Sequence, residues 1–254
     1  MGALRRPFQG VLNILRFNWH VYVLALGIVT ILAAASLRLE GPLRLVVVTT
    51  VVAIAAMTLT SLLVSCYVYD FSGLYRLDWL DAIPPHPGAR MLNIHAGFDE
   101  TSPILRARYP EAEWTVMDFY DPVKHTEVSI RRARKAYAPA AEDIRVSTHK
   151  LPVSPGSIDV AFVLFAAHEI RDEGERCAFF SELGRVLKPQ GKAVVLEHLR
   201  DGPNALAYTV GVFHFVGEKA WLASFAQARL RVVRRIKPNP LLTCFILEAN
   251  GNAS

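Results

Sequence analysis

The pattern of hydrophobic and polar positions divides the chain near residue 70. Residues 45–69 form a run of 25 uncharged residues, and residues 21–37 form an earlier run of 17. A helix needs about 20 apolar residues to cross a hydrocarbon core of about 30 Å. The pattern therefore predicts two transmembrane helices, over about 19–38 and 44–69.

The first apolar run has a second interpretation. Arg5 and Arg6 precede it, and it ends in Ala-Ala-Ala-Ser, as a secretory signal peptide does. We favour a hairpin, because the first 20 residues are long for the basic region of a signal and a second apolar run follows closely. Gly41-Pro42 supplies the turn. Residues 1–70 are thus predicted to anchor the chain in a membrane with both ends on one side.

After residue 70 the pattern changes to that of a water-soluble domain. Residues 71–90 contain Pro84, Pro85, Pro87 and Gly88, which interrupt regular structure and predict a linker. From residue 91 onward, apolar strand-like runs alternate with helical patterns, which is typical of a parallel sheet covered by helices. The predicted strands are 91–94, 114–119, 144–148, 159–167, 192–199, 229–237 and 241–249, and the predicted helices are 103–109, 128–137, 173–187 and 218–228.

The fold class predicted for residues 91–254 is therefore α/β. We expect a Rossmann-like sheet of seven strands, mostly parallel, preceded by the two transmembrane helices. Lys237-Pro238-Asn239-Pro240 joins the last two strands, which predicts an antiparallel hairpin and an antiparallel last strand.

Composition and charge add two constraints. Three cysteines lie far apart, so neither a zinc site nor a disulfide framework is indicated, and no metal ligands are predicted. The formal net charge is +5, which suits nucleic acid, anionic lipid or a solvated surface. Because the predicted anchor ties the domain to a bilayer, a nucleic-acid partner is disfavoured and anionic lipid is the better electrostatic partner.

Two sequence features suggest a nucleotide-type cofactor. Strand 91–94 leads into His95-Ala96-Gly97-Phe98-Asp99, where a small residue lets the backbone approach a ligand closely. Asp118 closes the second strand, 21 residues beyond Gly97, where a carboxylate can accept both hydroxyls of a ribose.

The second half of the domain carries more specific motifs. Leu151-Pro152, the Gly-Ser-Ile-Asp turn at 156–159 and the Glu-Leu-Gly-Arg-Val-Leu-Lys-Pro-Gln-Gly segment at 182–191 resemble class I S-adenosylmethionine (SAM)-dependent methyltransferases. The ubiquinone/menaquinone-type, small-molecule branch is the most similar. This resemblance covers residues 91–248 and implies SAM as the cofactor and methyl transfer as the reaction.

The glycine-rich turn of that family is altered in this chain. Its Asp-x-Gly-x-Gly-x-Gly positions hold Asn93, His95, Gly97 and Asp99, so only the middle glycine is kept. The resemblance implies a cofactor site at the ends of the first four strands. Its predicted residues are Asn93, His95, Gly97, Asp99, Asp118, Phe119, Thr148, His149 and Phe165.

The acceptor side is predicted beyond the fourth and fifth strands, because ligands of open parallel sheets bind at the carboxyl ends of strands. His168, Glu169 and His198 are the candidate catalytic residues, with a histidine as proton acceptor. The predicted function is methylation of a lipophilic small molecule or lipid at the membrane surface, with the domain facing the cytoplasm. A catalytically silent membrane scaffold and a nicotinamide-dependent enzyme are the alternatives.

Overall fold

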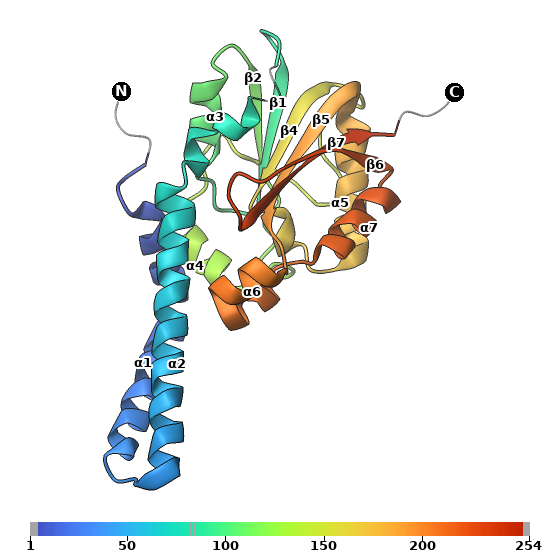
Figure 1. Cartoon of the computed structure of the whole chain (residues 1–254). Helices are drawn as coiled ribbons and strands as arrows, with labels where there is room; N and C mark the ends of the chain where they lie inside the picture. The colour runs from blue at the N-terminus through green and yellow to red at the C-terminus, as the bar shows by residue number, and fades with distance from the viewer. Residues whose placement is uncertain (1–4, 82, 84, 251–254) are drawn as a thin grey trace.

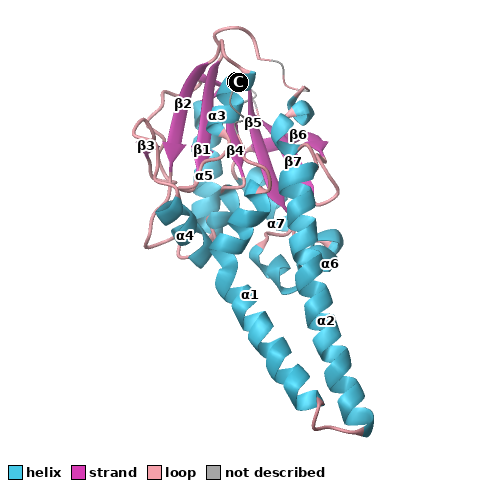
Figure 2. Ribbon diagram, turned by 90° about the vertical axis from the view of Figure 1, so that its left-hand side faces the viewer, coloured by secondary structure: helices cyan, strands magenta, loops and turns pink. Residues whose placement is uncertain are grey.

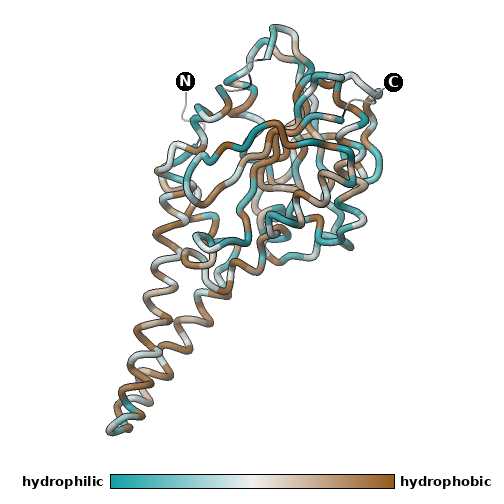
Figure 3. Tube along the Cα trace, turned by 45° about the vertical axis from the view of Figure 1, so that its right-hand side comes forward, coloured by the Kyte–Doolittle hydropathy of each residue, from teal (hydrophilic) through white to brown (hydrophobic). Residues whose placement is uncertain are grey.

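The computed structural model describes residues 5–81, 83 and 85–250. Two long helices, α1 (Gln9–Ser36) and α2 (Gly41–Cys66), form an antiparallel hairpin that projects from an α/β domain (Figure 1). The hairpin is apolar along most of its length (Figure 3). By length and composition both helices are able to cross a membrane.

Helix α1 begins ten residues earlier than the sequence predicts, and a kink at Asn18 divides it. Asn18 has non-helical backbone angles (φ −114°, ψ 19°), and its side-chain amide donates to the carbonyl of Ile14 at 3.2 Å. Before the kink, Gly10, Asn13 and Phe17 are buried against the domain, whereas residues after it are mostly exposed. The kink therefore separates a docked segment from the apolar arm.

A short π-helix, η1 (Tyr67–Phe71), continues α2 and holds the start of α1. Both carboxylate oxygens of Asp70 accept hydrogen bonds from this start, from the backbone N–H of Gly10 at 2.8 Å and of Val11 at 2.9 Å. These donors have no partner within the helix, and a negative charge is favourable at a helix N-terminus. The two ends of the hairpin are thereby joined at the domain surface.

Close contact at this junction requires a glycine. A Cβ atom at Gly10 would lie 2.3 Å from the Cβ of Tyr69. We expect Gly10→Ala to destabilise the fold by about 1–3 kcal/mol through overpacking, which lowers the Tm by about 2–10 °C for a chain of this size. Gly27→Ala is the matched control, because a Cβ there has no neighbour within 4 Å. Equal melting temperatures for the two variants in detergent would contradict this account.

Residues 71–81 and Ile83, expected to belong to a linker, instead form part of a packed layer. Two 3-10 turns, η2 (Leu74–Arg76) and η3 (Asp78–Leu80), direct buried side chains onto the sheet. Leu74, Leu77, Leu80 and Ile83 all enter one core cluster. The prolines stop regular helix as predicted, but the leucine spacing provides enough apolar surface for burial. Residues 82 and 84 lie outside the described residues.

The sheet has seven strands in the order β3-β2-β1-β4-β5-β7-β6. The first five strands in this order are parallel, and β7 is antiparallel to both β5 and β6. The predicted Rossmann-like sheet with antiparallel pairing at its end is therefore confirmed. The strands are β1 (Arg90–His95), β2 (Glu113–Asp118), β3 (Ile144–Arg145), β4 (Ile158–Leu164), β5 (Leu187–His198), β6 (Leu230–Ile236) and β7 (Leu242–Ala249).

Helices cover both faces of the sheet. The aromatic residues Phe179, Phe180, Trp221 and Phe225, from α5 (Glu173–Val186) and α7 (Glu218–Gln227), pack on one face. Helix α3 (Ser102–Arg108) packs on the other face, together with residues 71–81 and Ile83. The carboxyl ends of the parallel strands point toward the hairpin (Figure 2).

Strand β5 begins earlier than predicted, at Leu187, because the chain pairs with β4 on both sides of a bulge. Leu187 pairs with Ile158 and Lys192 with Val160, so the intervening residues loop out. A Cβ at Gly191 would meet the carbonyl of Ile158 at 2.7 Å. The glycine of the Lys-Pro-Gln-Gly segment therefore allows a close approach of two backbones, a structural role rather than a chemical one.

Two further elements were not predicted from the sequence pattern. Helix α6 (Gly202–Tyr208) and the 3-10 helix η5 (Thr209–His214) follow β5, and α6 packs beside α2. Helix α4 (Val128–Ala136) packs against α1. Both ends of the hairpin are thus braced by helices of the domain.

Candidate functional site

The turn after β1 is held by a network of side-chain hydrogen bonds. Asp99 Oδ1 accepts from the backbone N–H groups of Thr101 and Ser102, both at 2.9 Å, and so caps α3. Asn93 Nδ2 donates to Ser102 Oγ at 2.7 Å, and Asn93 Oδ1 is buried without a partner among the described residues. These two predicted cofactor residues therefore brace the turn in this conformation.

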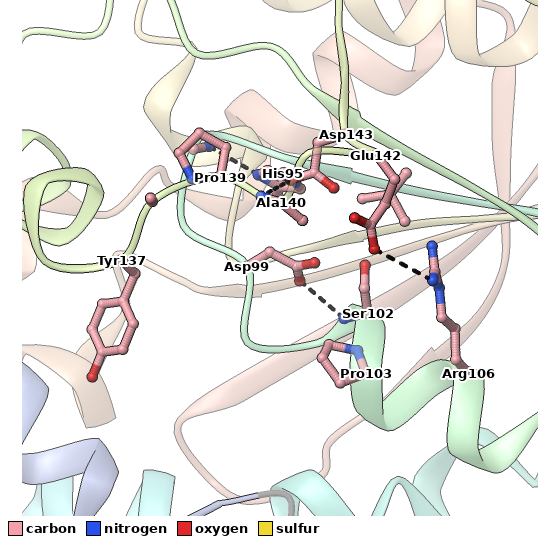
Figure 4. A pocket seen from close by; sticks show the side chains of 13 residues that line it. His95, Asp99, Ser102, Pro103, Arg106, Tyr137, Pro139, Ala140, Glu142 and Asp143 are labelled. Atoms are coloured by element: carbon pink, nitrogen blue, oxygen red, sulfur yellow. Dashed lines mark hydrogen bonds and ion pairs between the residues drawn. The ribbon is translucent and has the colours of Figure 1, made fainter.

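His95 and Gly97 line a cavity of about 370 Å³ beside this turn (Figure 4). The ring of His95 is buried, and its Nδ1 accepts from the backbone N–H of Gly97 at 3.0 Å. Its Nε2 lies 3.3 Å from Asp143 and has no hydrogen bond among the described residues. The remaining lining residues are Asp99, Ser102, Pro103, Arg106, Val116, Tyr137, Ala138, Pro139, Ala140, Glu142 and Asp143.

Asp118 closes β2 as predicted, but its carboxylate is already paired. Arg134, on α4, donates to Asp118 Oδ2 at 2.5 Å, and the backbone N–H of Tyr120 donates to Oδ1 at 2.9 Å. The same guanidinium covers Gly97, where a Cβ would lie 2.3 Å from Arg134 Nη1. A ribose placed between Gly97 and Asp118 would therefore clash with Arg134. The site is closed in this conformation.

Three other predicted cofactor residues do not meet at this turn. Phe119 is buried in the core, with its ring against Phe179. Thr148 Oγ1 donates to Glu175 at 2.5 Å, and His149 is exposed. Phe119 thus packs inside the domain although it directly follows the carboxylate, because side chains alternate between the two faces of a strand.

The predicted residues Phe165 and His198 belong to an aromatic cluster where the hairpin joins the domain. Phe165, which has a positive φ of 53°, packs against Tyr69 of η1 and against His198. His198 stacks on Phe215 with ring centroids 4.8 Å apart. The carboxyl ends of β4 and β5 therefore face the base of the hairpin through aromatic side chains.

Both ring nitrogens of His198 have partners. Its Nδ1 contacts Asn204 Oδ1 at 3.0 Å, and its Nε2 contacts the Tyr69 hydroxyl at 2.9 Å. The Asn204 amide nitrogen donates to Asp201 and Leu241, so the amide oxygen faces the histidine and Nδ1 is the donor. Burial lowers the pKa of His198 to about 4, which leaves the ring neutral with Nε2 as an acceptor.

His168 and Glu169 lie on a 3-10 turn, η4 (Ala167–Glu169), and meet two further groups. His168 Nδ1 donates to Glu197 Oε2 at 2.7 Å, and its Nε2 lies 3.4 Å from Glu169 Oε1. Burial alone would lower the pKa of His168, but the charge of Glu197 and hydrogen bonds to both glutamates raise it to about 10. The ring centroids of His168 and His214 are 5.1 Å apart. The structure thus brings two of the predicted catalytic residues into one ionic cluster.

The carboxyl ends of the parallel strands, with the side chains that pack on them, form a rim. Sequence reasoning did not identify two residues of this rim, Arg134 and Tyr69. Arg134 belongs to a basic run at 131–135 and carries no local signal for an internal role. Tyr69 ends the uncharged run of the second apolar segment and resembles an interfacial aromatic residue. Only the packing of α4 and η1 on the strand ends assigns these residues to the site.

Comparisons with known proteins agree with this architecture. Residues 95–195 match the family model described as a methyltransferase domain. The fold is similar to that of a SAM-dependent methyltransferase from Aquifex aeolicus, with 17% identity and a TM-score of 0.50 over 71% of this chain and 94% of that chain. It is also similar to the mitomycin 7-O-methyltransferase MmcR, with 17% identity and a TM-score of 0.53 over 97% of this chain and 74% of that chain. The curated proteins include no match to this sequence.

The matched region runs from the last residue of β1 to the middle of β5. It includes the Gly97 turn, Asp118 and the end of β4, whereas His198 at the end of β5 lies outside it. At 17% identity the two solved structures support the fold alone. The matched family model indicates methyltransferase activity. Residues 95–195 thus carry a methyltransferase domain, the fold is that of SAM-dependent methyltransferases, and SAM is the cofactor.

Proposed function

We propose that the chain methylates a lipophilic small molecule, or a lipid, that reaches the domain from a membrane. The observation that carries this proposal is the contact between hairpin and rim. Tyr69, at the end of the second apolar helix, contacts His198 at the end of β5. An acceptor that enters the aromatic cluster would therefore come from the side on which the hairpin projects.

An exposed apolar patch beside the hairpin supports the same direction of entry. Leu206, Val210 and Phe213, on α6 and η5, are 80%, 77% and 70% exposed. Exposed apolar residues that lie together next to a membrane segment are typical of surfaces that enter the lipid interface. Arg200 donates to the carbonyls of Phe213 and Phe215, so a basic group holds the base of the patch. Anionic lipid is the electrostatic partner we propose for it, with the domain in the cytoplasm.

The residues of the rim support distinct tasks in this reaction. SAM supplies an electrophilic methyl group when bound. The neutral Nε2 of His198 accepts a hydrogen bond from Tyr69, so this nitrogen is able to accept a proton if the tyrosine is displaced. Phe165 and Phe215 pack on the His198 ring and exclude water from an apolar acceptor. The cofactor fits at Gly97 and Asp118 only after Arg134 has moved, so we assign no step to the closed conformation.

The closed site also favours a second candidate function. The Arg134–Asp118 pair satisfies the carboxylate that would hold a ribose. If the pair never opens, the chain is a catalytically silent methyltransferase-like domain that acts as a membrane scaffold. Binding of S-adenosylhomocysteine (SAH) distinguishes the two functions.

The first test is calorimetric titration of SAH into the full chain in lipid nanodiscs. The wild type is expected to bind SAH, and Asp118→Asn is expected to weaken binding about ten- to hundredfold, because hydrogen bonds to a charged group contribute about 1.5–3 kcal/mol. Asp78→Asn, an exposed carboxylate paired with Arg76, serves as the control and should leave the affinity unchanged. Absence of binding to folded wild type would establish the scaffold instead. Methyl-labelled SAM incubated with lipid extracts then identifies the acceptor.

The second test asks whether the patch enters the bilayer. We expect a fluorophore attached to Val210→Cys, in a chain whose three native cysteines are replaced by serine, to be quenched strongly by spin-labelled lipids in nanodiscs. The same label at Val233→Cys, on an outer strand of the sheet, is the matched control and should not be quenched. Equal quenching at the two sites would rule out the proposed surface.

A further inference from the structure

A cluster of two histidines and one carboxylate lies at the rim, where the chain leaves β4. Ligand atoms of His168, Glu169 and His214 all lie within 4.8 Å of one another. His168 and Glu169 come from the turn after β4, and His214 ends the 3-10 helix after α6. Two distant segments of the chain therefore converge on one point.

The spacing of these atoms suits a metal ion. Zinc binds histidine nitrogen and carboxylate oxygen at about 2.0–2.1 Å in tetrahedral geometry, which separates two ligands by about 3.4 Å. His168 Nε2 and Glu169 Oε1 are 3.4 Å apart. A small movement of the His214 ring completes three ligands and leaves a fourth position open.

Glu197 supplies the outer support that such a site requires. Metal-binding histidines usually donate their other ring N–H to a carboxylate or carbonyl, which fixes the orientation of the ring. His168 Nδ1 donates to Glu197 Oε2 at 2.7 Å, and the backbone N–H of His168 donates to Glu197 Oε1 at 3.2 Å. The imidazole is thus held with Nε2 toward Glu169.

The carboxylate of Glu169 provides a second, independent observation that favours a bound cation. The residue is 4% exposed, and its Oε2 has no hydrogen-bond partner among the residues that the structure describes. A buried carboxylate oxygen without a partner is unfavourable.

One cation opposes metal binding here. Arg171 donates to His214 Nδ1 at 2.7 Å, and it also lies 3.3 Å from Glu127. Its side chain is partly exposed, so it is able to keep the Glu127 contact while His214 turns toward the cluster. Glu127 itself is 3.7 Å from His214 Nδ1, which places a further negative charge nearby.

We propose that His168, Glu169 and His214 bind a divalent transition-metal ion of the Zn²⁺ type, oriented through Glu197. Imidazole and carboxylate donors suit zinc and its neighbours better than magnesium or calcium. An oxygen atom of the acceptor could become the fourth ligand; this last point rests on the proposed function.

The test is a cobalt and zinc titration of the full chain, purified in detergent without a histidine tag and stripped with a chelator. Wild type is expected to bind one ion and to develop the intense visible absorption of tetrahedral Co²⁺, which zinc then removes. His214→Gln is expected to lower the affinity at least about hundredfold, and Glu197→Gln about ten- to hundredfold. His86→Ala, an exposed histidine, is the control and should match wild type.

Controls separate this inference from the proposed function. Circular dichroism confirms that each variant folds, and SAH affinity is measured on the same samples. Cobalt that gives no tetrahedral spectrum with wild type, or equal affinities for wild type and His214→Gln, would overturn the metal site even if SAH binds. A metal site that persists in a chain unable to bind SAH would overturn the proposed function alone.

Discussion

Replacing Arg134 by methionine is expected to tighten the binding of SAH at least about tenfold. Arg134 competes with the ribose for Asp118 and covers Gly97. If the open conformation is a minor one, the apparent dissociation constant is raised by the reciprocal of its population, and removing the competing group restores the intrinsic affinity. The measurement is the calorimetric titration described above, at one salt concentration.

Arg131→Met, on an exposed face of the same helix, is the matched control and should bind as wild type does. Weaker binding to Arg134→Met would contradict the closed-site account, because it would show that the guanidinium contacts the cofactor.

Opening of the site would also affect the contact between α4 and the hairpin. Arg132 of α4 donates to the carbonyl of Phe17 on α1 at 2.7 Å, and Tyr137 donates to Asn13 at 2.9 Å. Movement of α4 away from Gly97 would therefore alter or break these hydrogen bonds to the docked segment of α1.

Arg176→Ala is expected to destabilise the domain by about 3–5 kcal/mol. The guanidinium is buried against Trp221, donates to Ser224 Oγ at 2.9 Å, and donates to the carbonyl of Ile170 at 3.2 Å. Truncation leaves a cavity and removes the partners of buried polar groups, and the two effects add. Chemical denaturation followed by tryptophan fluorescence measures the loss.

Two further variants locate the cause of this destabilisation. Arg176→Met keeps most of the side-chain volume, so it should lose only the hydrogen-bond part, about 1–3 kcal/mol. Arg234→Ala, on an exposed position of β6, should change stability by less than about 0.5 kcal/mol. If Arg176→Ala were as stable as Arg234→Ala, the hydrogen bond from Arg176 to Ile170, next to the turn that carries His168 and Glu169, would contribute nothing to stability.

The amino-acid sequence by itself determined the two apolar helices, the order of the seven strands and of helices α3, α4, α5 and α7, and the residues at two strand ends. Hydropathy and periodicity are local properties, so runs such as 45–69 and 159–167 predict their elements without knowledge of the rest. The positions of Gly97 in a turn and of Asp118 at a strand end were predicted for the same reason, because both features are local. The docked start of α1 was missed, since its burial depends on Asp70 and Tyr69, which are distant in sequence.

The tertiary structure alone decided which of these residues meet. The pairing of Asp118 with Arg134 joins β2 to α4, and nothing in the basic run at 131–135 distinguishes the arginine that turns inward. The cluster of His168, Glu169 and His214 unites segments on either side of β5, whereas the sequence suggested no metal ligands because their spacing matches no local motif. Long-range contacts depend on how helices pack on the sheet, and packing is set by the whole core rather than by any one segment.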